Sequence, residues 1–170
     1  VDPGGVGNGG QLAGWCMSNG EGHGEHFSGE AYQRIELSEN GLDCRIVPAS
    51  DPVGEGTYSA AEFMPALIRD GEKLENQDWT GEQPRACFGA GDQGIYMLVI
   101  EGRYPDEGIR GTSVNTCADI LLAYGCRNAI NMDGGSSAIL WYDGEYVTQS
   151  SSVTLRYTGG RPLPNAWVYG

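Results

Sequence analysis

The stretch Asn128-Ala-Ile-Asn-Met-Asp-Gly-Gly-Ser-Ser137 joins a short apolar segment to a carboxylate, two glycines and two hydroxyl groups. Gly134 and Gly135 carry no side chain, so we expect a positive φ angle at one of them, and a ligand can approach the backbone closely there. Asp133 and the two serines would surround this bare backbone with hydrogen-bonding groups. The stretch therefore predicts a site for a polar substrate, such as a sugar or a phosphorylated compound. Its other interpretation is an ordinary turn between two strands, because Asp-Gly is a strong turn signal.

A helix is predicted before this stretch, over about residues 113–125. Apolar residues recur there at helical spacing, namely Val114, Cys117, Ala118, Leu121 and Leu122. Thr112 or Ser113 can cap its N-terminus, and Gly125 can end it. Further upstream, the nearly continuous apolar run Ile95–Ile100 is typical of a central strand that is covered on both faces.

Short strands are predicted elsewhere by apolar runs between turn residues. They are Leu12–Ser18, Ile35–Leu37, Cys44–Val47, Ala66–Arg69, Ala86–Gly89, Ala129–Met132, a hairpin of Ala138–Tyr142 with Glu145–Thr148, and Trp167–Tyr169, while Ser59–Phe63 is ambiguous. Strands outnumber helices, which predicts the α+β class, with a mixed β-sheet, one main amphipathic helix and short peripheral elements. At 170 residues the chain is expected to form a single domain over 1–170.

The composition restricts the partners. The chain has 23 acidic and 10 basic residues and a net charge of −13, which repels phosphate backbones at long range, so nucleic acid is not expected as a partner. A local cationic pocket for one phosphate is still compatible with this charge. No apolar run reaches the roughly 18 residues that a membrane span needs.

Cysteine and histidine give weak signals for a metal. The five cysteines show no CxxC spacing, so a zinc site is not expected, and Cys117 and Cys126 are predicted to be buried as small apolar residues. Glu25 lies between His23 and His26. Their spacing fits no standard zinc pattern, and the flanking glycines favour an exposed mobile loop.

Asn128–Ser137 resembles the N-A-I-N-L-D-G-G-[GS]-S pattern of the phosphodiester glycosidase family, the family of the lysosomal uncovering enzyme and its bacterial relatives, with Met132 in place of leucine. Other stretches resemble family motifs in the same order: Gly9–Gly14, Pro65–Gly71, Pro84–Gly89, Leu98–Arg103, Ala118–Cys126 and Arg161–Val168. Ala86 and Glu101 depart from the family's threonine and aspartate. The family's Asn-Gly-aromatic strand has no counterpart after Val1, so we expect the chain to lack an N-terminal segment.

The resemblance implies a hydrolase that cleaves a sugar-1-phosphodiester, such as an ester of N-acetylglucosamine-1-phosphate, to free sugar and a phosphomonoester. Arg85 and Arg103 would clamp the phosphodiester, because guanidinium geometry favours bidentate binding. Asp133 would stabilise an oxocarbenium-like transition state, attack as a nucleophile or activate water as a general base, and these three roles remain open. Glu101 is a further catalytic candidate, with a solvated or Arg103-paired carboxylate as its other interpretation. We expect Asp133, Arg85 and Arg103 to meet in one cleft.

The expected substrate-binding residues are Asn131, Gly134, Gly135, Ser136 and Ser137, although Asn131 and Ser136 are also suited to turn capping. No cofactor is expected to be required, while Ca²⁺ or Mg²⁺ could bridge Asp133 and a phosphate. The expected partner is a phosphorylated carbohydrate or cell-wall glycan, handled outside the cell or at its surface by a secreted bacterial enzyme of exopolysaccharide metabolism. The alternative function is a non-catalytic carbohydrate- or phosphosugar-binding module of a cell-surface or polysaccharide-related protein.

Overall fold

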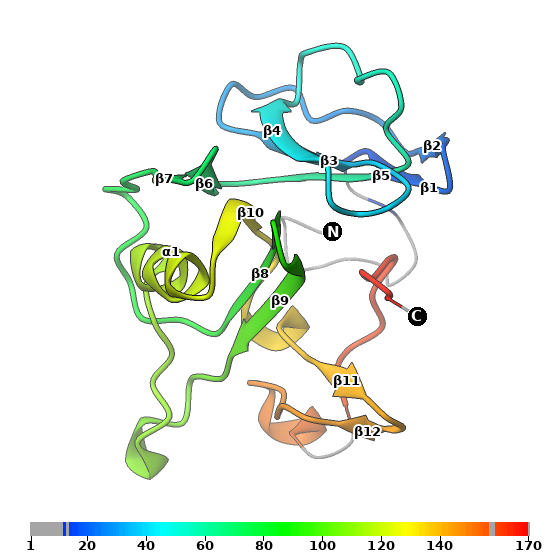
Figure 1. The fold of residues 1–170 in the computed structure, drawn as a ribbon. Helices are drawn as coiled ribbons and strands as arrows, with labels where there is room; N and C mark the ends of the chain where they lie inside the picture. The colour runs from blue at the N-terminus through cyan, green and yellow to red at the C-terminus, as the bar shows by residue number, and fades with distance from the viewer. Residues whose placement is uncertain (1–11, 13, 157–158, 170) are drawn as a thin grey trace.

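A computed structural model describes residue 12, residues 14–156 and residues 159–169. Two five-stranded sheets and one helix are stacked in three layers (Figure 1). The first sheet has the order β2-β1-β5-β3-β4 and contains β1 (Cys16–Ser18), β2 (Glu21–His23), β3 (Gln33–Leu37), β4 (Cys44–Pro48) and β5 (Ser59–Phe63). The second has the order β7-β6-β10-β8-β9 and contains β6 (Ala66–Arg69), β7 (Glu72–Lys73), β8 (Arg85–Gly91), β9 (Gly94–Ile100) and β10 (Cys126–Asn131).

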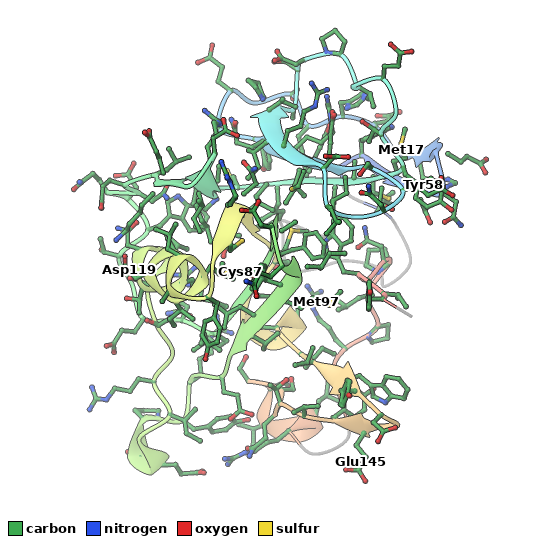
Figure 2. All side chains as sticks on the ribbon, viewed as in Figure 1. Met17, Tyr58, Cys87, Met97, Asp119 and Glu145 are labelled. Carbon is green, nitrogen blue, oxygen red and sulfur yellow. The ribbon has the colours of Figure 1, made fainter. Side chains whose placement is uncertain are left out.

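Two apolar cores hold the layers together. Between the sheets, Ile35 and Phe63 pack with Phe88 and Ile130, together with the partly buried Met97. Between the second sheet and the helix α1 (Val114–Ala123), the core contains Leu67, Ile68, Cys87, Val114, Cys117, Ala118, Leu121, Cys126 and Ala129. Figure 2 shows Cys87 beside α1 and Met97 on β9. The α+β class with one main helix is confirmed. The expected mixed sheet is wrong, because every strand pair of the described residues is antiparallel.

The helix begins and ends where its local signals predict. The Ser113 Oγ accepts a hydrogen bond of 3.2 Å from the Thr116 backbone N–H, which caps the first turn. Gly125 follows the helix with φ +89°, a conformation that costs glycine little. The sequence predicted both features because they depend only on neighbouring residues.

The strand Ile95–Ile100 was predicted to be central, and this position is wrong, because β9 is the last strand of its sheet. Ile95 and Met97 pack into the core between the sheets, while Tyr96 and Leu98 pack towards α1. A continuous apolar run therefore indicates that both faces of a strand are covered. It does not show whether the strand is central or lies at the edge of its sheet. The open edge is why all residues of β9 are only half-buried.

The C-terminal region differs from its prediction. Trp167–Tyr169 forms no strand. Instead, the Trp167 ring stacks on Phe88 with 3.7 Å between ring centroids, which adds an aromatic contact to the inter-sheet core. The predicted hairpin is present as β11 (Trp141–Tyr142) and β12 (Glu145–Tyr146). Three short 3₁₀ helices complete the described elements: η1 (Pro105–Glu107), η2 (Gly135–Ser137) and η3 (Val153–Leu155).

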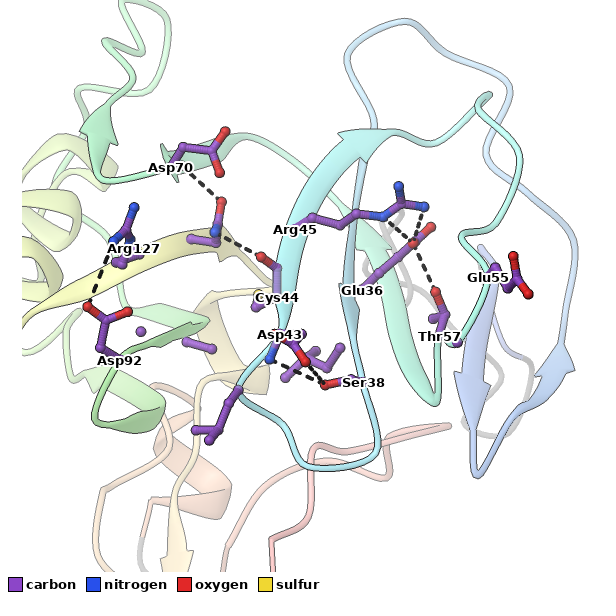
Figure 3. A pocket seen from close by; sticks show the side chains of 16 residues that line it. Glu36, Ser38, Asp43, Cys44, Arg45, Glu55, Thr57, Asp70, Asp92 and Arg127 are labelled. Carbon is purple, nitrogen blue, oxygen red and sulfur yellow. Dashed lines mark hydrogen bonds and ion pairs between the residues drawn. The ribbon is translucent and has the colours of Figure 1, made fainter.

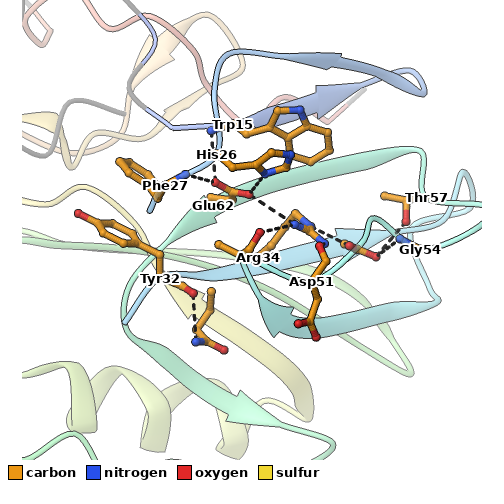
Figure 4. A network of polar contacts seen from close by, with 12 residues as sticks. Trp15, His26, Phe27, Tyr32, Arg34, Asp51, Gly54, Thr57 and Glu62 are labelled. Atoms are coloured by element: carbon orange, nitrogen blue, oxygen red, sulfur yellow. Dashed lines mark hydrogen bonds and ion pairs between the residues drawn. The ribbon is translucent and has the colours of Figure 1, made fainter. Parts of the chain in front are cut away.

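A buried charge network lies in the first sheet (Figure 4). The Arg34 guanidinium donates to Glu36 Oε1 at 2.7 Å and to Glu62 Oε1 at 3.4 Å. All three side chains are buried, so each charge depends on its partners. His26 Nδ1 lies 2.5 Å from Glu62 Oε1, and its ring stacks on Trp15. The predicted exposure of this segment is confirmed at His26, whose side chain is 48% exposed, while the contact with Glu62 ties His26 to the sheet.

The structure also tests the sequence for metal-ligand clusters, cysteine burial and membrane-spanning helices. No cluster of three or more histidine, cysteine or acidic residues suited to a metal is found among the described residues. The five cysteines are free thiols, and Cys117 and Cys126 are buried as predicted. None of the helices in the described part of the chain is both long and apolar enough to span a membrane.

Candidate active site

Residues from four separate segments line a cavity of about 360 Å³. The lining residues are Gln83, Pro84, Arg85, Arg103, Asp133, Gly134, Gly135, Ser136, Ser137 and Arg161. The sheet explains why they meet. Arg85 at the start of β8 pairs with Ile100 at the end of β9, and Cys87 pairs with Asn131 at the end of β10. The segments that enter β8 and leave β9 and β10 therefore emerge at one end of the second sheet.

Asp133 is held by Arg161. Arg161 Nη2 lies 3.0 Å from Asp133 Oδ2, and about a quarter of each side chain is exposed. The same guanidinium donates from Nε and Nη2 to Ser137 Oγ, at 3.1 and 2.8 Å. One cation therefore orients both the carboxylate and a hydroxyl of the Asp-Gly-Gly-Ser-Ser turn, which limits the positions that the carboxylate can take.

Arg85 is a buried cation that also lines the cavity. Its side chain donates from Nε to the Thr112 carbonyl at 3.1 Å and from Nη2 to the Gly81 carbonyl at 2.8 Å, and no ion pair joins it to a carboxylate of the described residues. Burial lowers the pKa of Arg85, while the Cys117 and Cys87 thiols act in the opposite direction. A desolvated guanidinium without a counter-ion is suited to binding an anion in the cavity.

Arg103 is exposed, and an unusual backbone conformation and contacts with Gln83 and Gly135 hold its side chain at the cavity. Its φ angle is +69°, which is uncommon for a residue with a side chain. Nε and Nη2 donate to Gln83 Oε1 at 3.1 and 3.0 Å. A Cβ added to Gly135 would lie 3.1 Å from Arg103 Nη1, so the guanidinium packs directly on this glycine.

The glycines of the turn serve close packing as well as conformation. Gly135 has φ +59°, which confirms the expected positive φ angle, whereas Gly134 has φ −103°. At Gly134, an added Cβ would lie 2.6 Å from the Pro84 carbonyl oxygen, and that oxygen accepts a hydrogen bond of 3.1 Å from the Gly135 N–H. Only glycine permits the turn to lie this close to the segment that carries Arg85.

The cavity thus combines three guanidinium groups with one carboxylate in a chain of net charge −13. A sequence model of the phosphodiester glycosidase family matches residues 5–169. The chain belongs to the phosphodiester glycosidase family. No curated protein sequence matches it.

Solved structures with the same fold include the catalytic domain of zebrafish N-acetylglucosamine-1-phosphodiester α-N-acetylglucosaminidase, described as auto-inhibited by its pro-peptide. It superposes with a TM-score of 0.64 and 16% identity over 90% of this chain and 56% of that domain. This phosphodiester glycosidase chain therefore spans about half the length of that relative. A hypothetical protein from Synechocystis matches with a TM-score of 0.45 and 19% identity over 72% of this chain and 32% of its own.

Two residues that the sequence assigned to the site do not line the cavity of this phosphodiester glycosidase domain. Glu101 Oε1 accepts a hydrogen bond of 2.7 Å from the Gln149 backbone N–H, so its carboxylate anchors the segment after β12 and does not pair with Arg103. Asn131 is buried, and its Nδ2 donates to the Met64 carbonyl at 2.8 Å. Both were predicted from the stretches that resemble family motifs, and a motif does not determine the side to which a side chain points.

Conversely, Arg161 and Gln83 line the cavity but were not predicted as site residues. Arg161 opens the stretch that resembles the terminal family motif, and that resemblance was the available signal. No local pattern relates it to Asp133, because their contact joins positions 28 residues apart. Gln83 carries no signal beyond its place before Pro84-Arg85.

The donor set does not fit a divalent cation. Ca²⁺ and Mg²⁺ prefer several oxygen ligands with carboxylates among them, whereas Asp133 is the only carboxylate among the described cavity residues and already pairs with Arg161. Three neighbouring guanidinium groups oppose a second cation by like-charge repulsion. The cavity is therefore built for an anion.

A second cavity of about 360 Å³ lies between the two sheets (Figure 3). Its charged residues are mostly acidic, namely Glu36, Asp43, Glu55, Asp70 and Asp92, against Arg45 and Arg127. Burial raises the pKa of the Cys44 thiol in this cavity to about 12, so the thiol is protonated and a poor nucleophile at neutral pH. None of the predicted site residues lines this cavity, and its charge disfavours a phosphodiester.

Proposed function

We propose that the chain hydrolyses a sugar-1-phosphodiester between the anomeric carbon and the bridging oxygen, releasing the free sugar and leaving the phosphate on the alcohol. The observation that carries this proposal is that Asp133, Arg85 and Arg103 line one cavity. Family membership and the shared fold support the same reaction class.

The charges match the reaction. A phosphodiester carries one negative charge, and the departing phosphomonoester gains a second as the bond to the anomeric carbon breaks. Arg85 and Arg103 therefore bind the leaving group more strongly as the reaction proceeds, which lowers the barrier more than it stabilises the substrate. The carboxylate of Asp133 stabilises the positive charge that develops at the anomeric carbon, attacks that carbon, or removes a proton from the attacking water. Because phosphate is a good leaving group, the reaction does not depend on a strong general acid.

Turnover of the methyl ester of N-acetylglucosamine-1-phosphate in ¹⁸O-labelled water tests the proposal. We expect free N-acetylglucosamine and methyl phosphate, with no ¹⁸O in the phosphate, because the sugar–oxygen bond breaks. Incorporation of ¹⁸O into the phosphate would show attack at phosphorus and would contradict a glycosidase. Tight binding of the ester without turnover would favour the alternative of a phosphosugar-binding module.

A further inference from the structure

Exposed aromatic side chains gather on the hairpin β11–β12. Trp141 is 61% exposed, Tyr142 73% and Tyr146 50%, and Val147 directly after the hairpin is 56% exposed. Large apolar groups that are grouped on a surface usually mark a binding site, whereas isolated ones need no explanation. The proposed cleavage of the phosphodiester uses none of these four residues.

The hairpin presents two rings on one face. Trp141 is directly opposite Tyr146 in the antiparallel pair, so their side chains share a face, whereas Tyr142 and Glu145 share the other. The hairpin base is held by a hydrogen bond of 2.8 Å from the Val147 N–H to the Leu140 carbonyl and one of 2.7 Å from the Leu140 N–H to Thr148 Oγ1. The two rings are therefore positioned before any ligand arrives, which reduces the entropy cost of binding.

This aromatic face, formed by Trp141 and Tyr146, is continuous with the cavity. The Tyr146 ring lies over Gly159, where an added Cβ would be 2.4 Å from the ring. At Gly160, an added Cβ would lie 3.6 Å from the Ser136 carbonyl oxygen, and Arg161 then enters the cavity. On the other side, the hairpin begins a few residues after Ser137, which also lines the cavity.

The size of the cavity requires that a larger substrate extend outside it. Ligand pockets for small molecules begin at about 300 Å³, so a cavity of about 360 Å³ has room for one sugar ring and its phosphate. The alcohol of the ester must therefore lie on the surrounding surface, and the aromatic face adjoins the cavity there.

The chemistry of the face favours neutral sugars. A tryptophan and a tyrosine offer flat apolar rings with a polar edge, which match the C–H faces and hydroxyl groups of a pyranose. The hairpin carries Asp143 and Glu145, and Glu145 points outward (Figure 2). With a net charge of −13, the surface repels a polyanionic glycan.

We propose that the aromatic face of Trp141 and Tyr146 binds a neutral oligosaccharide that forms the alcohol side of the phosphodiester. This inference rests on the proposed function for the identity of the bond that is cleaved. It makes the substrate an oligosaccharide ester and not the ester of a small alcohol.

The first test measures binding without turnover. Isothermal titration calorimetry would use neutral trisaccharides of glucose, mannose, galactose and N-acetylglucosamine, with trigalacturonate as the anionic counterpart. We expect at least one neutral trisaccharide to bind, and Trp141→Ala and Tyr146→Ala each to weaken it by about 3–10-fold. Tyr142→Ala, on the opposite face of the same hairpin, is the matched control and should leave the affinity unchanged. Binding of none of the neutral trisaccharides, or tighter binding of trigalacturonate, would overturn the proposal.

The second test is kinetic. The trisaccharide that binds best is esterified to N-acetylglucosamine-1-phosphate and compared with the methyl ester. We expect kcat/KM to favour the trisaccharide ester in the wild type, and the ratio of the two values to fall by about 3–10-fold in Trp141→Ala and Tyr146→Ala. An unchanged ratio would overturn the proposal, whereas loss of turnover of both esters in the wild type would count against the proposed function alone.

Sedimentation and melting measurements identify other occupants of the face. If Trp141→Ala converts a dimer into a monomer, the face binds a second copy of the chain. If the same substitution lowers the melting temperature by more than about 5 °C, the ring is buried by another part of the protein. Either result without an effect on trisaccharide binding would overturn the proposal.

Discussion

Arg161 and Asp133 form an ion pair in the cavity, with 3.0 Å between Nη2 and Oδ2, although 28 positions separate them in the chain. The pair joins the C-terminal segment to the turn that follows β10. Because the guanidinium also holds Ser137 Oγ, the geometry of the proposed catalytic carboxylate depends on a residue outside its own motif.

Asp133→Asn should abolish most of the release of sugar from a sugar-1-phosphodiester. The amide keeps the size of the carboxylate but removes the charge, so kcat should fall by about 10²–10⁴-fold. The melting temperature, measured beside turnover, should change little because the side chain is partly exposed. Unchanged turnover would show that another residue performs the role proposed for Asp133.

Arg161→Gln should act through Asp133. We expect kcat to fall by about 10–10²-fold in the wild-type background and by less than about 3-fold in the Asp133→Asn background, because coupled residues are not additive. Arg127→Gln is the matched control, since Arg127 forms an exposed ion pair with Asp92 away from the cavity. Equal losses in both backgrounds would show that Arg161 does not act by positioning the carboxylate.

Substitutions of Arg85 and of Arg103 should differ in their effect on the stability of the fold. Arg85 is 7% exposed and bonds two carbonyl groups, so Arg85→Gln should lower both the affinity for a sugar-1-phosphodiester and the free energy of unfolding, the latter by about 2 kcal/mol. Arg103 is exposed, so Arg103→Gln should weaken binding and leave unfolding within about 0.5 kcal/mol. Denaturant titration and calorimetry measure the two quantities, and equal stability losses would contradict this division.

The parts of this fold that depend on neighbouring residues could be predicted from the sequence. The helix α1 has its cap at Ser113, its apolar stripe and its terminal glycine within a dozen positions, and the turn at Gly135 depends on one φ angle. The division into two sheets could not be predicted in this way. Strand β1 pairs with β5, with Cys16 opposite Ala61, and no local pattern encodes such a pairing.

The candidate site shows the same distinction. Asp133, Arg85 and Arg103 lie where the motifs indicated, because each motif places its residue at the end of a strand. Glu101 also lies at a strand end, but its carboxylate reaches Gln149, and Arg161 reaches the cavity only through tertiary folding. Strand position predicts which end of a sheet a residue occupies, and packing determines where its side chain points.

Gly135→Ala should reduce activity more than its stability loss explains. Gly135 has φ +59° and an added Cβ would lie 3.1 Å from Arg103 Nη1. The positive φ angle alone costs an alanine about 1–2 kcal/mol, and the methyl group would also push the Arg103 guanidinium aside by a few tenths of an ångström.

Gly56→Ala is the matched control for this substitution. Gly56 has φ +78° and no atom within 4 Å of an added Cβ, so this variant carries only the backbone cost. Both variants should lose a similar free energy of unfolding, and only Gly135→Ala should lose affinity for the phosphodiester. Equal activities at a temperature where both are folded would show that Gly135 does not position Arg103.

Glu36→Gln should remove part of the acid sensitivity of the fold. Burial raises the pKa of Glu36, but hydrogen bonds from Arg34, Arg45 and Thr57 outweigh it, so the pKa lies below its ordinary value of 4.5. The group therefore stabilises the folded state fully above pH 4.5 and progressively less as the pH falls through its lower folded pKa. At pH 7 the variant should lose about 3 kcal/mol of unfolding free energy, because a buried ion pair is broken, and its difference from the wild type should shrink towards pH 3.

Glu55→Gln is the matched control. Glu55 is an exposed neighbour in the second cavity (Figure 3), and its substitution should leave the dependence of stability on pH unchanged. A difference that stays constant from pH 7 to 3 in urea titrations would contradict the assignment to Glu36.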